Sequence, residues 1–316
     1  MKIAVLDDYA LASPRLADWP ELGDVTVFQD TITGTDLVDR LLPFDVICLM
    51  RERTPMGADL IAQLPNLRLI VTSGPRNASI DLPAARAAGI TVCGTQSRKT
   101  TTSELTTLMM LTLNRRLFPE VANLSAGGWQ SGLGRDVAGL TLGLIGLGNI
   151  GAQMAVIGKA LGMDIIAWSP NLTHARCTEL GVARAESLTD LMARADVASV
   201  HMVLSDRSRG LVDAAAFAAA KQGQVFINTS RGALVDTGAL LDGLRAGKPA
   251  MAGLDVFDVE PLPLDDPLRD ADLIASGQLL LTPHLGYTTE ATFRLFYTQT
   301  VEAIRAYQAG TPIREL

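Results

Sequence analysis

The sequence predicts an α/β protein built from two doubly wound parallel sheets. Three observations support this prediction: a length of 316 residues, short apolar runs that resemble strands, and amphipathic segments between those runs. At roughly 150 residues per domain, such a chain is expected to form two domains. The apolar runs are nearly continuous, which is typical of strands that helices cover on both faces of a parallel sheet.

The first alternating series predicts strands at Lys2–Leu6, Val25–Phe28, Asp45–Met50, Leu67–Thr72 and Ile90–Cys93. Helices are expected between them, at Thr35–Leu42, Gly57–Leu64 and Asp81–Ala88. The third of these helices starts at an aspartate that can cap its N-terminus. Gly89 follows it, at the position where a left-handed residue commonly ends a helix.

The segment Thr102–Phe118 interrupts the alternation. Its leucine and methionine residues fall on more than one helical face, so we expect a long helix that is covered on several sides. A glycine-rich stretch, SAGGWQSGLGRD, follows and is expected to be an exposed loop. The second series then predicts a final helix at Glu290–Ala309, after strands at Thr141–Ile145, Asp164–Trp168, Val197–Met202, Gln224–Asn228, Met251–Val256 and Leu279–Thr282.

Charge and composition exclude several classes of partner. The formal net charge is −7, from 27 Lys and Arg against 34 Asp and Glu, and no basic cluster is present, so we expect neither nucleic acid nor an anionic membrane as a partner. The N-terminal apolar run is short, and no run is long enough to span a membrane, so neither a signal peptide nor a membrane span is expected. The dispersed Cys48, Cys93 and Cys177 fit neither a disulfide framework nor a zinc cluster, so we expect no metal and a reducing, cytoplasmic location.

A glycine-rich turn is the first candidate binding site. Gly146-Leu-Gly148-Asn149-Ile150-Gly151 directly follows a predicted strand and opens a helical pattern. In a dinucleotide-binding turn the first glycine permits the tight turn, the second lets the backbone approach a pyrophosphate, and the third allows close packing of helix and strand. The N–H groups of the helix N-terminus then face the phosphates. The alternative is a strand–helix turn that binds nothing.

The next predicted strand ends where such folds commonly place an acid that binds the adenosine ribose. This chain has Ser169 there instead, with Asn171 close behind. Because no carboxylate repels a 2′-phosphate, Ser169 and Asn171 can donate to one. Arg176 or His174 could add positive charge. We therefore expect NADP(H) to be favoured, with NAD(H) as the alternative.

Proton-transfer candidates are few, because the chain has three histidines. His174 lies in a polar loop near the expected ribose site, and His201 is near a strand end, where we expect an ordinary structural role. His284 comes just after a predicted strand and before a glycine. Ligands of open α/β sheets gather beyond the carboxyl ends of the strands, so this position favours His284.

Two further strand ends carry charged residues. Arg231 follows the predicted strand at Gln224–Asn228 and precedes a glycine, and Glu260 follows the one at Met251–Val256. A single arginine or glutamate in such a place is usually a surface residue. The ordered set of a glycine-rich turn, an arginine, a glutamate and a histidine, each after a strand, favours an active site.

These residues lie in segments that resemble the D-isomer-specific 2-hydroxyacid dehydrogenase family, in its glyoxylate/hydroxypyruvate reductase-like form. In the second half the similar segments are GLGNIG (146–151), NTSRG (228–232), GLDVFDVEP (253–261) and TPHLG (282–286). In the first half they are RLIVTSGPRNASIDLPAARAAGITV (68–92) and SELTTLMMLTLNR (103–115). The resemblance thus covers nearly the whole chain.

The resemblance implies two Rossmann-like domains with the active site in the cleft between them. Residues 1–100 plus 287–316 would form a discontinuous substrate domain, and residues 101–286 the dinucleotide-binding domain. It also implies a homodimer made through the cofactor domains, which would explain the apolar Thr102–Phe118 segment.

The resemblance also implies roles for individual residues. His284 would be the acid/base, with Glu260 as its carboxylate partner, and Arg231 would bind the carboxylate and keto oxygen of the substrate. The backbone near Arg76 and Asn77 would clasp the same carboxylate. Asp255 would hold the nicotinamide carboxamide, and the other cofactor contacts would be Thr229, Ser230 and Gly286. Ser169 departs from the family pattern, and so does Pro75, which has no N–H to offer the substrate.

The expected reaction is hydride transfer between NAD(P)(H) and a small D-2-hydroxy acid or 2-oxo acid. Negative charge that develops on the keto oxygen needs a nearby cation, and the oxygen then needs a proton. An arginine and a histidine supply these, and a neighbouring carboxylate favours the protonated histidine. The acid itself is not identified, although Arg51, Arg53 and Arg76 suggest an acidic or polar one. Its side chain would be selected by the loops Arg51–Pro55 and Ser73–Asn77 and by Tyr287.

Three alternatives remain. The first is a catalytically silent cofactor-sensing scaffold or co-regulator of the same fold, and the second is a relative that acts on formate or phosphite. The third is a phosphoglycerate enzyme with a C-terminal regulatory domain, which we do not expect because the sequence runs only from His284 to Leu316 after the last motif.

Overall fold

The computed structural model describes residues 1–19 and 21–316. Two compact units share the chain: one comprises Met1–Arg98 with Thr288–Leu316, and the other comprises Lys99–Tyr287. Each of these limits lies within two residues of an expected domain limit. The assignment of the units to substrate and cofactor, and the active-site cleft, stay predictions.

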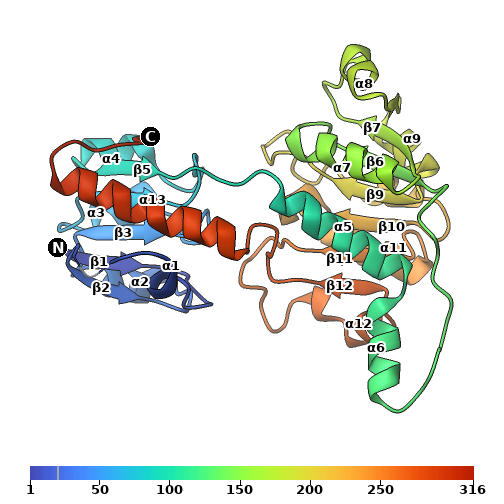
Figure 1. The fold of residues 1–316 in the computed structure, drawn as a ribbon, viewed down its shortest axis with the longest axis horizontal. Coiled ribbons are helices and arrows are strands. Elements are labelled where there is room, and N and C mark those ends of the chain that lie inside the picture. The colour runs from blue at the N-terminus through green and yellow to red at the C-terminus, as the bar shows by residue number, and fades with distance from the viewer. Residues whose placement is uncertain (20) are drawn as a thin grey trace. The chain divides into compact units, whose positions relative to one another are not determined.

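Unit 1, as we call the unit that contains both chain ends, is built around a five-stranded parallel sheet of order β2-β1-β3-β4-β5 (Figure 1). Its strands are β1 (Lys2–Val5), β2 (Asp24–Val27), β3 (Val46–Leu49), β4 (Leu69–Thr72) and β5 (Thr91–Gly94). Its helices are α1 (Ser13–Leu16), α2 (Gly34–Leu41), α3 (Ala58–Ala62), α4 (Leu82–Ala87) and α13 (Glu290–Gln308).

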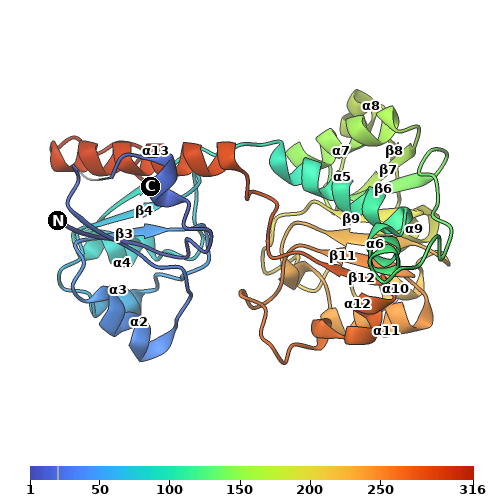
Figure 2. The same cartoon turned by 60° about the horizontal axis from the view of Figure 1, so that its bottom comes forward.

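Helices cover both faces of this sheet. Apolar residues of α2, α3 and α4 form one core cluster with alternate strand residues such as Ile47 and Ile70. On the other face, α13 packs against α1, β4 and β5 (Figure 2). Both faces of the central strands are therefore buried, which explains why these strands read as continuous apolar runs.

Unit 2, residues Lys99–Tyr287, contains a seven-stranded parallel sheet of order β12-β11-β10-β9-β6-β7-β8 (Figure 1). Its strands are β6 (Thr141–Ile145), β7 (Asp164–Trp168), β8 (Ala183–Arg184), β9 (Val197–Val200), β10 (Val225–Asn228), β11 (Met251–Leu254) and β12 (Leu279–Leu281). Its helices are α5 (Thr101–Asn114), α6 (Leu117–Ser125), α7 (Asn149–Ala160), α8 (His174–Leu180), α9 (Leu188–Arg194), α10 (Ala214–Ala218), α11 (Thr237–Ala246) and α12 (Ala271–Ala275), with short 3₁₀ turns at η1 (Gly232–Leu234) and η2 (Pro267–Arg269).

This sheet is also doubly wound. One core cluster joins the sheet to α5, α7 and α8, and a second joins it to α9, α10, α11 and α12. The strand order changes direction between β6 and β9, and such folds bind ligands beyond the carboxyl ends of the two strands at this point. The predicted class, two doubly wound parallel α/β sheets, is confirmed.

Most predicted elements occur with small shifts at their ends. The strands at Thr141–Ile145 and Asp164–Trp168 match β6 and β7. Asp81 caps α4 by accepting from the N–H of Ala84, and Gly89 adopts a φ of 72°, as its position predicts. The two-residue strand β8 was not predicted, because two residues carry no readable pattern.

The predicted long helix at Thr102–Phe118 is wrong. The chain forms α5 and α6 instead, and Arg116 between them has a left-handed backbone with a φ of 53°. Pro119 gives the reason, because a proline has no N–H for a continuous helix and fits only the first turn of a new one.

The apolar character of α5 does not need a dimer to explain it. α5 packs on β10 and β11 and against α7, and its buried residues include Met109, Met110 and Leu113. α5 exposes Leu108, and more exposed apolar residues lie on α6, where no residue is buried and Leu117, Phe118, Val121 and Leu124 are exposed.

Candidate active site

The structure brings the three predicted catalytic residues to neighbouring strand ends in unit 2. Arg231 follows β10, Glu260 follows β11 and His284 follows β12, and these strands are adjacent in the sheet. All their pairings are parallel, so the three residues lie beyond the same carboxyl edge. This is the edge at which α/β sheets bind ligands.

His284 is held in one orientation by its neighbours. Its Nδ1 atom lies 2.6 Å from Oε2 of Glu260, and its ring meets that of Tyr287 edge to face, with 5.2 Å between the centroids. Oε1 of Glu260 accepts the backbone N–H of Phe257 at 3.0 Å, so the carboxylate is fixed as well. With Nδ1 directed at the carboxylate, Nε2 is the atom through which His284 can exchange a proton.

Asp255 fixes the turn that carries His284. It is fully buried, and it accepts hydrogen bonds from the hydroxyl of Thr282 and from the N–H groups of Leu285 and Gly286, at 2.6, 2.6 and 2.8 Å. Burial raises the pKa of Asp255, and these hydrogen bonds oppose the rise. The turn thereby keeps His284 in a left-handed backbone with a φ of 53°, which costs a non-glycine residue energy.

Arg231 stands on a rigid turn. The side chain of Asn228 accepts from the N–H of Ser230 and donates to the carbonyl of Arg231, at 3.0 and 2.8 Å. Nη1 of Arg231 donates to the carbonyl of Ser230 at 2.7 Å. A Cβ atom on Gly232 would lie 2.2 Å from the carbonyl carbon of Phe257, so the turn after β10 packs directly on the segment that leads to Glu260.

The glycine-rich turn has the geometry that a dinucleotide needs. Gly146 has a φ of 107°, and a Cβ atom on Gly151 would lie 2.1 Å from the carbonyl oxygen of Gly146. A Cβ atom on Gly148 would meet nothing within 4 Å, which leaves open space at the glycine where a pyrophosphate should approach. Because α7 starts at Asn149, the N–H groups of Asn149 and Ile150 have no acceptor within the helix. The residues present therefore fit a nicotinamide dinucleotide.

At the end of β7 the predicted ribose contacts lie in a tight turn. Ser169 is half-buried and Asn171 is exposed, and the N–H of Leu172 closes the turn onto the carbonyl of Ser169 at 3.1 Å. Arg176, which the sequence suggested as a source of charge, is paired with Glu179 of its own helix at 2.8 Å. The other predicted contacts are placed as follows: Thr229 shares a hydrogen bond with Thr106 at 2.8 Å, and Ser230 donates to the carbonyl of Val200 at 2.7 Å.

The predicted substrate loops of unit 1 also lie at the carboxyl edge of its own sheet. Asp7, Arg51 and Gly74 follow β1, β3 and β4, and all three have positive φ values, of 57°, 55° and 99°. Non-glycine residues with such values, here Asp7 and Arg51, tend to collect at functional sites. Asn77 is buried and braces the edge, because its side-chain amide donates to the carbonyl of Arg51 and to the hydroxyl of Thr72, at 2.7 and 2.9 Å. Arg76 is exposed.

His201 is unsuited to proton transfer. Both of its ring nitrogens are buried without a hydrogen-bond partner, at the end of β9 beside the glycine-rich turn. Burial lowers the pKa of His201 to about 3. The ring is therefore neutral at ordinary pH.

We expect the buried neutral His201 to make the folded chain sensitive to acid. The unfolded chain regains the ordinary pKa of 6.5, so between pH 6.5 and 3 it binds a proton that the folded chain does not. At pH 5.5 this should lower the free energy of unfolding by about 1.4 kcal/mol relative to pH 8. Urea unfolding at pH 8 and pH 5.5 measures the free energy of unfolding of the parent and of His201→Gln. Its decrease between the two pH values should be smaller in the variant by this amount. Equal decreases in parent and variant would contradict the prediction.

Some supporting residues were not predicted. Thr282 and Thr106 are partners of predicted site residues, and Arg184 lies at the ribose-side turn, where its Nε donates to the carbonyl of Leu172 at 3.2 Å. Thr282 stands two residues before His284 in the segment TPHLG, and Thr106 stands in the segment SELTTLMMLTLNR, so both had a signal in the sequence, whereas Arg184 had none.

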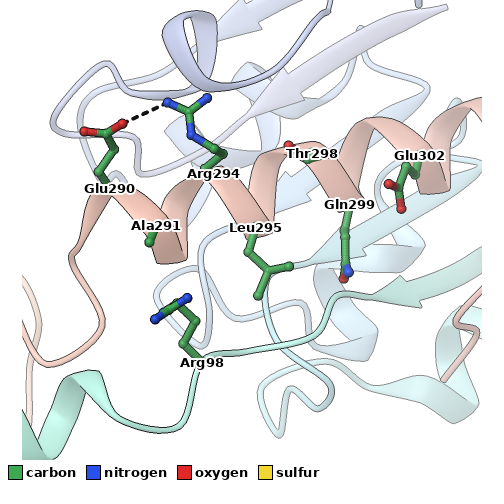
Figure 3. Close-up of a pocket in the computed structure, with 8 residues that line it drawn as sticks. All are labelled: Arg98, Glu290, Ala291, Arg294, Leu295, Thr298, Gln299 and Glu302. Carbon is green, nitrogen blue, oxygen red and sulfur yellow. Dashed lines mark hydrogen bonds and ion pairs between the residues drawn. The ribbon is translucent and has the colours of Figure 1, made fainter.

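A separate cavity of about 690 Å³ lies in unit 1 beside α13 (Figure 3). Arg98 faces the helix across it, and residues of α13 between Glu290 and Glu302 form the wall. Arg294 in this wall is paired with Glu290 at 2.8 Å. None of the predicted site residues lines the cavity.

Comparison with known proteins decides the family. Residues 107–286 match the family described as D-isomer specific 2-hydroxyacid dehydrogenase, NAD binding domain. The chain belongs to the D-isomer specific 2-hydroxyacid dehydrogenase family. The resemblance seen in the sequence motifs is thereby confirmed, and the glycine-rich turn and the strand ends of β10, β11 and β12 lie in the NAD-binding domain of this family.

Similar proteins carry several names. The chain is 31% identical over 324 residues to a glycerate dehydrogenase of Methylorubrum extorquens, covering 98% of this chain and 97% of that one. It is 34% identical over 265 residues to a D-3-phosphoglycerate dehydrogenase of Mycobacterium leprae, covering 83% of this chain but 49% of that one, so it spans about half the length of this relative. The solved structure of a phosphoglycerate oxidoreductase of Vibrio cholerae O395 matches with a TM-score of 0.91 at 36% identity, over 98% of this chain and 100% of that one.

Residues 1–19 and 21–316 contain neither a membrane-spanning helix nor a cluster of metal ligands. No helix there combines the length and the hydrophobicity that crossing a membrane requires. No group of three or more His, Cys, Asp and Glu side chains there is arranged to hold a metal ion, and Cys48, Cys93 and Cys177 are free thiols.

Proposed function

We propose that this chain is an NAD(P)-dependent reductase of small 2-oxo acids, with the D-2-hydroxy acid as product. The observation that carries the proposal is the set Arg231, Glu260 and His284 at the ends of β10, β11 and β12, with 2.6 Å between Nδ1 of His284 and the Glu260 carboxylate. This set lies in the same sheet as a glycine-rich turn that fits a dinucleotide. The bound nicotinamide would supply the hydride.

The protein residues bind the substrate and move its proton. Arg231 pairs with the carboxylate and the keto oxygen, and its positive charge stabilises the negative charge that develops on that oxygen. Protonated His284 donates from Nε2 to the same oxygen, while Glu260 holds Nδ1 and stabilises the positive ring. Asp255 keeps the turn of His284 in place, and we also propose that it receives the nicotinamide carboxamide.

Unit 1 would supply substrate selection. We propose that backbone groups near Arg76 and Asn77 bind the carboxylate, with Pro75 unable to donate. The substrate side chain would be read by loops at the ends of β3 and β4. There, Arg53 lies 5.3 Å from the centre of the Tyr9 ring and Arg51 donates to the carbonyl of Ser73 at 3.3 Å. These cations favour a polar or acidic 2-oxo acid over an apolar one.

A substrate panel tests this function. Glyoxylate, hydroxypyruvate, pyruvate and phenylpyruvate are supplied in turn with NADPH and with NADH, and oxidation of the reduced cofactor is followed at 340 nm. We expect turnover with at least one acid. The polar acids should be turned over faster than phenylpyruvate. Nucleotide binding without any turnover would favour a cofactor-sensing scaffold instead. A parallel assay supplies formate or phosphite with NADP⁺ and with NAD⁺ and follows reduction of the cofactor. Turnover in that assay alone would favour a dehydrogenase of one of these two anions.

We expect Ser169→Asp to shift the preference from NADPH toward NADH. The parent has no carboxylate at the end of β7, so we propose that it favours NADPH modestly. The new carboxylate would accept from both ribose hydroxyls and repel a 2′-phosphate by about 1–3 kcal/mol. The measurement is kcat/KM with each cofactor in parent and variant. A parent that strongly prefers NADH would overturn the cofactor assignment.

We also propose a homodimer, with α6 as the apolar part of its interface. Leu117, Phe118, Val121 and Leu124 are between 47% and 58% exposed, and the loop after α6 presents Trp129 at 76% and Leu133 at 94%. This loop is held in shape, since the carboxylate of Glu120 accepts from the N–H and the hydroxyl of Ser131. Exposed apolar side chains that cluster on one helix and its following loop commonly mark an interface.

The double variant Val121→Glu with Leu124→Glu should convert the dimer into a monomer. Two charges would be buried in the interface without partners, which strongly opposes association. Light scattering on a sizing column measures the mass of each species. The control is Val156→Glu, an exposed valine of α7, which should stay dimeric. A parent that is monomeric at micromolar concentration would disprove the dimer.

A further inference from the structure

The edge strand β8 places a positive charge near the ribose-side turn of unit 2. β8 pairs with β7 in parallel, and Arg184 is level with Ala167, close to the end of β7 and to Ser169. The expected position of the adenosine ribose is just beyond this end of β7. Arg184 thus belongs to the same edge of the sheet as Ser169 although it lies on another strand.

The turn after β7 holds the guanidinium of Arg184. Its Nε donates to the carbonyl of Leu172 at 3.2 Å, and Nη1 lies 3.4 Å from Nε2 of His174. The N–H of Leu172 is in turn bonded to the carbonyl of Ser169 at 3.1 Å. The guanidinium of Arg184 is therefore held close to the turn that starts at Ser169.

The carboxylate of Glu186, which is paired with Arg184, is a weak competitor for a ligand. Nη1 is 3.0 Å from Oε2 of Glu186, whose side chain is 75% exposed, while that of Arg184 is 24% exposed. Exposed ion pairs contribute little, since solvent screens them. A phosphate dianion can replace such a carboxylate, because a guanidinium binds phosphate through two parallel N–H groups.

We propose that Arg184 is the residue that recognises the 2′-phosphate of NADP(H), together with the side chains of Ser169 and Asn171. The proposal rests on the dinucleotide binding proposed above and names the group that makes the choice of cofactor. Arg176 stands nearer to Ser169 in the sequence and has a similar exposed partner, Glu179, but that partner lies on its own helix and its guanidinium pairs along α8. Arg184 instead bonds to the turn itself.

Nucleotide binding tests this role without any turnover. Calorimetry on the full chain compares adenosine 2′,5′-bisphosphate with 5′-AMP, which differ by the 2′-phosphate alone. The parent should bind the bisphosphate more tightly. Arg184→Gln should lower the affinity for the bisphosphate by about 10-fold or more, as expected for a lost hydrogen bond to a charged group. The affinity for 5′-AMP should stay within about twofold of that of the parent. The control is Arg194→Gln, which removes the same charge from the end of α9, before β9, and should leave both affinities unchanged.

Other outcomes overturn the proposal. If Arg184→Gln lowered the affinity for both nucleotides equally, Arg184 would have a structural role in the turn and no specific contact with the 2′-phosphate. Selective weakening by Arg176→Gln and not by Arg184→Gln would make Arg176 the phosphate ligand. A parent that binds both nucleotides equally has no 2′-phosphate site. If selective binding is present but no 2-oxo acid is reduced, the reductase function fails while the assignment of Arg184 stands.

Discussion

His284→Gln should lower the turnover of 2-oxo acids by about 10²–10⁴-fold, the usual effect of losing a positioned acid/base. The amide can keep a hydrogen bond to Glu260, but it has no proton to give to the keto oxygen. Because His284 is proposed to act at the reacting oxygen and lies away from the glycine-rich turn in the strand order of the sheet, the dissociation constant for the reduced cofactor should change little. Steady-state kinetics and cofactor fluorescence titration measure the two quantities separately.

Two companion variants sharpen this result. Glu260→Gln should show an intermediate loss, because it keeps the proton carrier and removes the carboxylate 2.6 Å from Nδ1. The control is Asp258→Asn, an exposed carboxylate two residues away in the same loop, which should retain turnover. Near-parental kcat in His284→Gln would remove this histidine from the chemical step.

Arg231→Ala should reduce kcat/KM by about 10²–10³-fold, comparable to removal of a donor that stabilises an oxyanion. Both KM and kcat should worsen, since the guanidinium is proposed to bind the carboxylate before the reaction and the developing charge during it. Arg231→Lys should recover only part of the loss. An ammonium is a point charge, and it cannot both bond to the Ser230 carbonyl, as Nη1 does at 2.7 Å, and present a planar fork.

The measurement is the separate determination of kcat and KM for the best acid of the panel. Arg194→Lys serves as the matched control, because it makes the same exchange in an exposed pair at the end of α9. If Arg231→Lys behaved like the parent, a two-point contact with the substrate would be excluded.

Much of the fold follows from the sequence because its signals are local. Each βα unit carries its own apolar run, its own cap and its own glycine, as Asp81 and Gly89 illustrate around α4. The site also follows in part. Strands of a parallel sheet share one carboxyl edge, so Arg231, Glu260 and His284 meet there once each is placed after a strand.

What the sequence left open depends on register and packing. Arg184 bonds to the carbonyl of Leu172 because β8 pairs with β7 at a particular register. A strand of two residues is too short for a sequence pattern to predict this pairing. The helix break at Arg116 was readable in Pro119, and the apolar faces of α5 predicted its burial. What covers α5 was not predicted, because the cover comes from α7 and from strands far along the chain.

The sequence by itself determined the chemical groups and the order in which strands present them. The tertiary structure decided how those groups are held. Asp255 shows the difference, since its three hydrogen bonds to residues 282, 285 and 286 exist only where the end of β11 lies beside the end of β12. Local propensity acts between neighbours along the chain, whereas hydrogen bonds between strand ends depend on which strands become neighbours in the sheet.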